Sequence, residues 1–253
     1  MISVKPWSLE AVMRLFLGVI VTLCCGMFLA GVLDSVNSMK WVKSGLSPGQ
    51  LQFAQTLVLV ASFQGAALIW IALFLRQSNI SWRAAFGLRP PSRAGAVAAG
   101  LAMGLAVLPT MWLLQWGSEC VMELLRLKPA AQAAVLELQN SSLSVPEQVV
   151  FGVFTIVLAP IAEEALFRGI LYSTIKQAGH PRWALWGTSA VFGVMHFNMA
   201  ALVPLVVLSV LLVFLYEASD SLLTPIATHS MFNAVNFFYL VFADPINRLL
   251  HIS

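Results

Sequence analysis

The sequence predicts an all-α membrane protein, a bundle of about seven transmembrane helices around an internal polar cavity. Of the 253 residues, 59% are hydrophobic and only 10% are charged, whereas an average soluble domain carries about 25% charged residues. The apolar residues form runs that approach the length of about 20 residues needed to cross a bilayer. Ionisable side chains inside such runs are costly in lipid and therefore face protein or water, which predicts the polar cavity.

We expect a single membrane domain over residues 1–253, because no polar linker is long enough to separate two domains. The formal net charge of +3 is small and indicates no nucleic-acid partner, whereas the composition makes the lipid bilayer the expected surroundings. The three cysteines show neither the spacing of metal ligands nor a disulfide framework.

The first apolar run, Leu15–Leu33, follows Lys5 and Arg14 and so resembles the core of a secretory signal. It has 19 residues, which is longer than the usual signal core of about 7–15, and no clear small-x-small cleavage site follows it. We therefore expect this run to be kept as the first span.

Six further spans are expected in order along the chain. They are Phe53–Leu75, Ala94–Trp116, Gln148–Tyr172, Trp183–Met199, Ala200–Tyr216 and Leu222–Ala243. The fifth and sixth run almost together, and Asn198, Pro204 or the small residues between them could make the turn. The stretch from Gly117 to Glu147 admits an eighth element, with short helices at Cys120–Leu127 and Ala130–Leu138.

Charges in the connecting segments predict the orientation in the membrane. The segment between the second and third spans carries four arginines and no acid: Arg76, Arg83, Arg89 and Arg93. The segment after the fourth span carries Lys176 and Arg182, whereas the long segment after the third span is acidic. Because positively charged connectors stay in the cytoplasm, the N-terminus is expected to be cytoplasmic and the C-terminus outside, in an inner or plasma membrane.

The arginine-rich connector includes an alternation of aromatic and basic residues from Ile80 to Pro91. It can be an interfacial helix that lies on an anionic leaflet. It can equally be a connector with ordinary anchoring charges.

The fourth predicted span carries Glu163, Glu164 and Arg168. Residues four apart share a helix face, whereas adjacent residues diverge by about 100°. Glu164 is therefore expected to pair with Arg168, which leaves Glu163 available as a general base. The alternative is a single salt-bridge cluster of all three charges that holds helices together.

Two later spans supply imidazoles and an amide. His196 ends a Phe-x-x-x-His pattern that begins at Phe192, and His229 and Asn233 lie four apart on the last span. An imidazole and an amide that project together can form an oxyanion hole. The alternative is a set of hydrogen bonds between helices.

The expected depths of these groups agree. At 1.5 Å per residue, Glu163 lies roughly 14 Å and His196 roughly 20 Å from the cytoplasmic ends of their spans. His229 lies roughly 10 Å and Asn233 roughly 16 Å from the cytoplasmic end of the last span. Polar groups from three spans can therefore meet in one slab of the membrane.

The ordered motifs Glu-Glu-x-x-x-Arg, Phe-x-x-x-His and His-x-x-x-Asn resemble the CPBP family. That family includes the CAAX prenyl endopeptidases and the bacteriocin-processing or self-immunity proteins of bacteria, also called the abortive-infection family. The resemblance covers roughly Gln148 to Tyr239, within the expected core helices of residues 148–243. The stretch near Glu217 and Asp220 departs from the commoner family pattern, in which many members carry a basic residue and glycine.

The resemblance implies an all-helical membrane bundle with a conical cavity and the activity of an intramembrane glutamate protease. Glu163 and His196 would activate a water, and His229 and Asn233 would stabilise the oxyanion. Glu164 and Arg168 would position the site. The implied substrate is a membrane-associated protein or peptide, which the best-known members bind in prenylated form.

Other interpretations remain open at this point. Two imidazoles and a carboxylate suit zinc, so Glu163, His196 and His229 could hold that metal, although the resemblance favours a mechanism without a cofactor. A non-catalytic membrane scaffold or immunity protein would keep the same polar core for folding. A transporter could use it to relay protons, but no internal repeat is evident.

Overall fold

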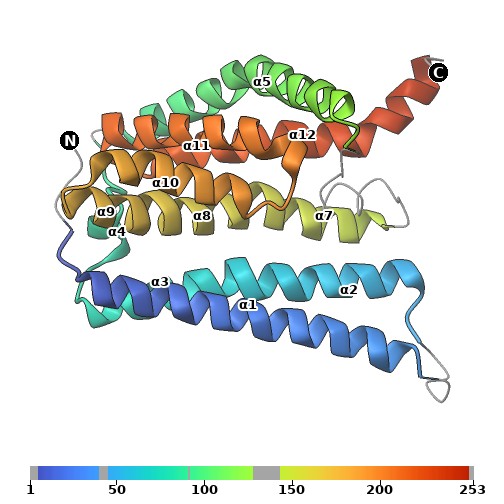
Figure 1. Cartoon of the computed structure of the whole chain (residues 1–253), viewed down its shortest axis with the longest axis horizontal. Coiled ribbons are helices and arrows are strands. Elements are labelled where there is room, and N and C mark those ends of the chain that lie inside the picture. The colour runs from blue at the N-terminus through green and yellow to red at the C-terminus, as the bar shows by residue number, and fades with distance from the viewer. Residues whose placement is uncertain (1–4, 40–44, 91, 128–142, 251–253) are drawn as a thin grey trace.

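Each of the seven predicted spans overlaps a helix in a computed structural model, which describes residues 5–39, 45–90, 92–127 and 143–250 (Figure 1). The described residues contain no strand. The helices are α1 (Leu9–Asn37), α2 (Pro48–Val60), α3 (Ala66–Gln77), α4 (Trp82–Ala85), α5 (Arg93–Leu124), α7 (Val145–Val153), α8 (Ala159–Glu164), α9 (Ser173–Gln177), α10 (Pro181–Val194), α11 (Met199–Ser219) and α12 (Leu223–Leu250). Three π-helical segments join pieces of these into longer helices: η1 (Ala61–Gly65), η2 (Phe154–Leu158) and η3 (Ala165–Tyr172).

Five of the described helices are long and apolar enough to cross a membrane. They are Leu9–Asn37, Pro48–Gln77, Arg93–Leu124, Val145–Gln177 and Met199–Ser219. Large apolar side chains point outward from them, including Phe28, which is 76% exposed. An apolar exterior of this kind suits contact with lipid. The chain is therefore an integral membrane protein with a helical bundle fold.

The prediction of a full fifth span over Trp183–Met199 was wrong. The helix there, α10, has 14 residues, and at 1.5 Å per residue it reaches only about 21 Å of the roughly 30 Å hydrocarbon core. The turn between α10 and α11 accordingly lies part-way along the neighbouring long helices, and does not reach their ends (Figure 1). α10 and α11 thus form a hairpin whose turn is at internal depth.

Two other predicted segments can be compared with the structure only in part. The stretch from Cys120 belongs to the end of α5, and the short helix expected at Ala130–Leu138 falls outside the described residues. The arginine-rich connector contains only the single turn α4, and its Ala85 and Phe86 are each 1% exposed. The described part of the connector is therefore docked on the bundle through these two residues.

The helices form two groups. α1 pairs with the helix made by α2, η1 and α3, while α5, α11 and α12 pack on one another beside α10 (Figure 1). Between these groups runs the helix from α7 to α9, which packs on α12 through η2 and α8 and on η1 through α8. The three predicted motifs lie on this middle helix and on the hairpin and α12 next to it.

α12 approaches α5 closely because α5 has glycines four apart at the contact. A Cβ on Gly100 would lie 2.5 Å from the Thr224 carbonyl oxygen, and one on Gly104 would lie 2.7 Å from that of Thr228. The Thr228 hydroxyl donates to the Gly100 carbonyl at 3.0 Å. Small residues at this spacing are a common means of packing membrane helices, and here they fix the helix that carries His229.

We expect Gly104→Ala to destabilise the fold by about 1–3 kcal/mol, because the added methyl group overpacks the contact between α5 and α12. Gly117→Ala on the same helix is the matched control, since nothing lies within 4 Å of its Cβ position. The control should be neutral or slightly stabilising through helix propensity. Denaturant unfolding in detergent measures both, and equal stabilities would contradict the close contact.

Candidate active site

The glutamate pair lies at the end of α8, in a helix that is irregular on both sides. Pro160 has no N–H, and the Ala159 N–H donates to the Phe154 carbonyl in the π pattern. The carbonyl of Thr155 therefore lacks a donor from its own helix. The Asn233 side chain of α12 supplies the missing donor, and its Nδ2 donates to the Thr155 oxygen at 2.9 Å.

Glu164 is the buried centre of a hydrogen-bonded network, with 0% exposure. Its Oε1 accepts from Arg168 Nη1 at 2.8 Å and from His229 Nδ1 at 3.0 Å. The predicted pairing of Glu164 with Arg168 is confirmed. Arg168 also reaches α11, where Nη2 donates to the Ser209 hydroxyl at 2.8 Å and to its carbonyl at 3.2 Å.

Glu163 differs from its neighbour although both side chains are buried. It makes no hydrogen bond to any described residue, and its nearest cationic or imidazole group is His229, with Oε2 3.9 Å from Nε2. The side chain is 10% exposed. One carboxylate of the pair is thus held by arginine and histidine, and the other is left with an imidazole nearby.

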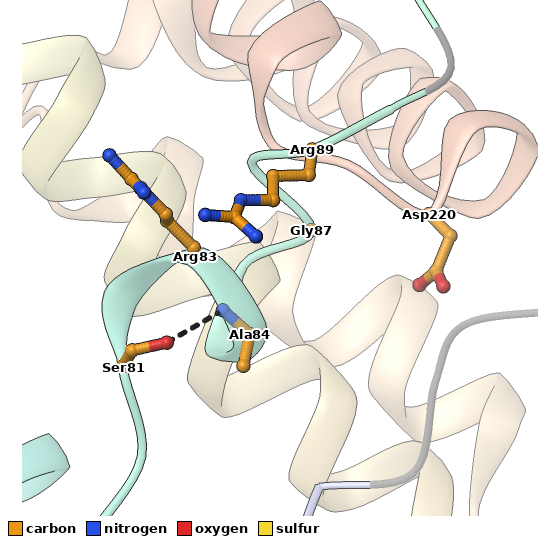
Figure 2. A pocket seen from close by; sticks show the side chains of 6 residues that line it. All are labelled: Ser81, Arg83, Ala84, Gly87, Arg89 and Asp220. Carbon is orange, nitrogen blue, oxygen red and sulfur yellow. Dashed lines mark hydrogen bonds between the residues drawn. The ribbon is translucent and has the colours of Figure 1, made fainter.

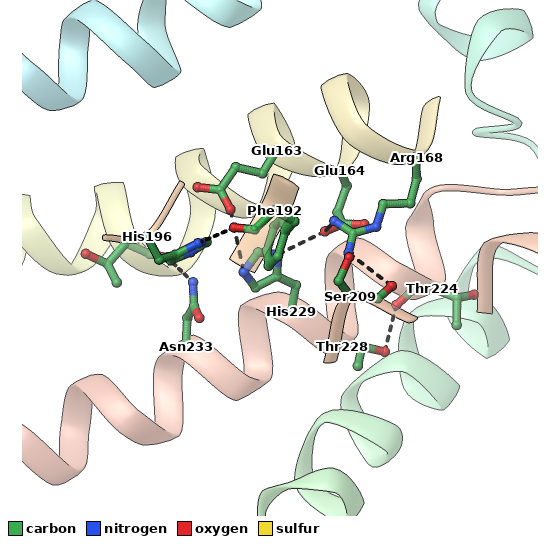
Figure 3. A network of polar contacts seen from close by, with 11 residues as sticks. Glu163, Glu164, Arg168, Phe192, His196, Ser209, Thr224, Thr228, His229 and Asn233 are labelled. Carbon is green, nitrogen blue, oxygen red and sulfur yellow. Dashed lines mark hydrogen bonds and ion pairs between the residues drawn. The ribbon is translucent and has the colours of Figure 1, made fainter. Parts of the chain in front are cut away.

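His196 lies in the turn between α10 and α11, two residues beyond the end of α10. Its Nδ1 is 2.7 Å from the Phe192 carbonyl oxygen (Figure 3). Because a carbonyl can only accept, this contact places the proton on Nδ1 and leaves the Nε2 lone pair available. Asn198 caps α11 by accepting from the Ala201 N–H at 3.0 Å. Side chains of the turn therefore bond to the Phe192 carbonyl at the end of α10 and to the Ala201 N–H at the start of α11.

The ring of Phe192 joins the parts of the site. Its centroid lies 4.9 Å from the ring of His196, 5.8 Å from the ring of His229 and 4.6 Å from the guanidinium carbon of Arg168. The ring therefore fixes both imidazoles and covers one face of the buried cation.

The structure thus brings Glu163, Glu164, Arg168 and His229 into direct contact. His196 joins them through Phe192, and among the described residues it forms no ion pair with either glutamate. Asn233 is held beside the same helix by Thr155, and no described contact joins it to His229. The described residues contain no group of three or more histidine, cysteine or acidic side chains arranged to hold a metal ion.

Sequence reasoning missed two partners in this network. Ser209 is a lone hydroxyl in the apolar run of α11, and that isolation was the available signal. The Thr155 carbonyl gave no signal in the sequence, because the π-helical segment, and not the residue type, leaves this backbone acceptor without a donor.

The fold and this cluster define a polytopic helical membrane protein with glutamate, histidine and arginine side chains buried in its bundle. Residues 145–235 match the family model described as Type II CAAX prenyl endopeptidase Rce1-like. This match confirms the resemblance predicted from the three motifs, and it covers all six predicted site residues. No curated protein and no solved structure matches the chain.

Proposed function

We propose that this protein is an intramembrane endopeptidase that hydrolyses a peptide bond of a membrane-associated protein or peptide. The observation that carries the proposal is the contrast between the two adjacent glutamates. A carboxylate that already accepts from arginine and histidine is a poor base, whereas Glu163 has no hydrogen-bond donor among the described residues. The family match supports hydrolysis of a peptide bond as the reaction.

In the proposed mechanism Glu163 takes a proton from a water molecule that attacks the scissile carbonyl carbon. The His196 Nε2 lone pair orients the same water, since Nδ1 is committed to the Phe192 carbonyl. The tetrahedral oxyanion accepts from the second Nδ2 hydrogen of Asn233 and from His229. Glu163 then passes its proton to the leaving amine, which restores the site.

Glu164 and Arg168 act in this proposal as positioning residues. Glu164 holds His229 through Nδ1 at 3.0 Å, so that Nε2 faces the site. Because the Nδ1 hydrogen is used in this bond, His229 donates to the oxyanion from Nε2 in its imidazolium form. The proposed water activation uses no metal or other cofactor, and zinc bound by Glu163 and the two histidines is the competing mechanism.

The proposed setting is an inner or plasma membrane with the N-terminus in the cytoplasm, as the arginines between α3 and α5 predict. The start of α1 and the end of α12 lie at opposite ends of the bundle (Figure 1), which suits an N-terminus and a C-terminus on opposite sides. A prenylated protein is one substrate class, and other membrane proteins or peptides are equally open.

Comparative peptidomics of membranes is the experiment that tests this function. Cells that make the wild-type chain are compared with cells that make Glu163→Gln at the same level. Cleavage products that occur only with the wild-type chain would identify the substrate and the bond. An unchanged peptide set would favour a non-catalytic scaffold.

We expect Asn233→Ala to lower turnover by about 10²–10³-fold, the usual cost of losing one oxyanion donor. Asn236→Ala is the matched control, because Asn236 is the next amide on α12 and bonds outside the cluster, to the Phe232 carbonyl and to Trp112. Rates measured on a substrate found by peptidomics decide the point. Equal losses in the two variants would assign Asn233 a role in packing alone.

A further inference from the structure

A hollow of about 640 Å³ opens at the end of the bundle where α3 and α11 finish and α5 begins (Figure 2). It lies outside the glutamate cluster, on the connector from α3 to α5 and the turn from α11 to α12. The lining residues are Ser81, Arg83, Ala84, Gly87, Arg89 and Asp220.

The walls of the hollow are fixed to the bundle. The Leu222 N–H donates to the Phe86 carbonyl at 3.0 Å, and the Phe86 side chain is buried. Gly87 has a φ of +59°, and a Cβ there would lie 1.9 Å from the Asp220 carbonyl oxygen. The connector and the turn therefore meet backbone to backbone, and only glycine permits that approach.

The hollow has an excess of positive charge. Arg83 and Arg89 line it, and neither guanidinium makes an ion pair or hydrogen bond within the described chain. Lys5 lies behind them with its Nζ donating to the Ala85 carbonyl at 2.8 Å. Burial lowers the pKa of Lys5, and the Asp220 carboxylate opposes that shift by favouring the charged ammonium. Asp220, the one acid among the described residues that line the hollow, is thus offset by a lysine, which leaves two arginines for a ligand.

We propose that this hollow binds the phosphate of an anionic membrane lipid. Two guanidinium groups on one wall match the oxygens of a phosphate, which arginine recognises with paired N–H donors. The hollow lies where membrane-crossing helices end, which is the depth of lipid headgroups. Trp82 lies in α4 between the lining residues Ser81 and Arg83, and tryptophan is enriched at that interface. This inference does not depend on proteolysis.

Lipid binding to the purified full-length chain in detergent tests the proposal. Native mass spectrometry compares phosphatidylglycerol with phosphatidylcholine as the probe. We expect the wild-type chain to retain phosphatidylglycerol preferentially, and Arg83→Gln with Arg89→Gln to weaken that binding on the order of 10-fold. Arg76→Gln with Arg93→Gln removes the same charge from the helix ends that flank the connector, outside the hollow, and this pair should change binding by less than about 2-fold.

Three outcomes would overturn the proposal. If both double variants weakened phosphatidylglycerol binding equally, the lipid would be attracted by the diffuse positive charge of this segment and not by the hollow. Equal retention of the two lipids by the wild-type chain would mean no anion site. The third outcome is that millimolar inorganic phosphate displaces phosphatidylglycerol and, on its own, raises the melting temperature as much as the lipid does. That result would assign the hollow to a free phosphate ion. All four arginines are exposed, so the variants should melt like the wild-type chain, and this is checked in the same detergent.

Discussion

Replacing Glu163 by glutamine is expected to lower the cleavage rate by about 10³-fold, within the range of about 10²–10⁴ that a positioned general base contributes. Glutamine keeps the shape of the side chain but cannot accept the proton of water. Stability should change little, because Glu163 makes no hydrogen bond that the substitution would break among the described residues. Single-turnover rates and unfolding midpoints in the same detergent measure the two effects.

Glu164→Gln is the control for the adjacent position. It has the same chemistry, yet it removes the charge that holds both Arg168 and His229. We expect this variant to lose stability as well as activity, since a buried cation is left without its carboxylate. If Glu163→Gln kept full activity, or if it unfolded as readily as Glu164→Gln, the division of roles between the two glutamates would be wrong.

The pairing inside the glutamate motif could be predicted because it depends only on helix spacing. Glu164 and Arg168 lie four residues apart, and the contact survives although π-helical geometry begins between them, at Ala165. The same reasoning placed Glu163 away from Arg168. Local periodicity is therefore enough where both partners belong to one helix.

The position of His196 could not be predicted in the same way. Its sequence surroundings are apolar on both sides, so the run reads as a continuous span, whereas the chain turns at Met195 to Asn198. The turn is stable at internal depth because the His196 ring and the Asn198 side chain satisfy the ends of α10 and α11. Tertiary capping of this kind leaves only a weak signal in the sequence.

The partners of the contacts between helices could not be predicted either. The sequence offered hydrogen bonds between helices as one interpretation of His229 and Asn233, but it did not indicate that the Thr155 carbonyl is the partner of Asn233. That acceptor is free because the π-helical segment and Pro160 together remove its usual donor. An irregular backbone in one helix thus leaves a carbonyl that a side chain of the neighbouring helix bonds to.

Replacing Arg168 by methionine is expected to cost about 3–5 kcal/mol of stability, the usual effect of removing one partner of a buried ion pair. The guanidinium is 1% exposed, and it joins η3 to α11 through Ser209 as well as to Glu164. Methionine fills much of the volume but leaves the Glu164 carboxylate buried with His229 as its remaining partner. Equilibrium unfolding in detergent measures the loss.

The pair Glu10 and Arg14 is a matched control, because it has the same spacing but lies on an exposed helix face, with Arg14 Nη1 3.1 Å from Glu10 Oε1. Arg14→Met should leave the unfolding midpoint unchanged, since exposed ion pairs contribute little. Adding Glu164→Gln to Arg168→Met should restore most of the lost stability, because the uncompensated charge is then gone. A double variant no more stable than Arg168→Met would show that the cost comes from packing against Phe192 and Ser209, and that the ion pair itself contributes nothing.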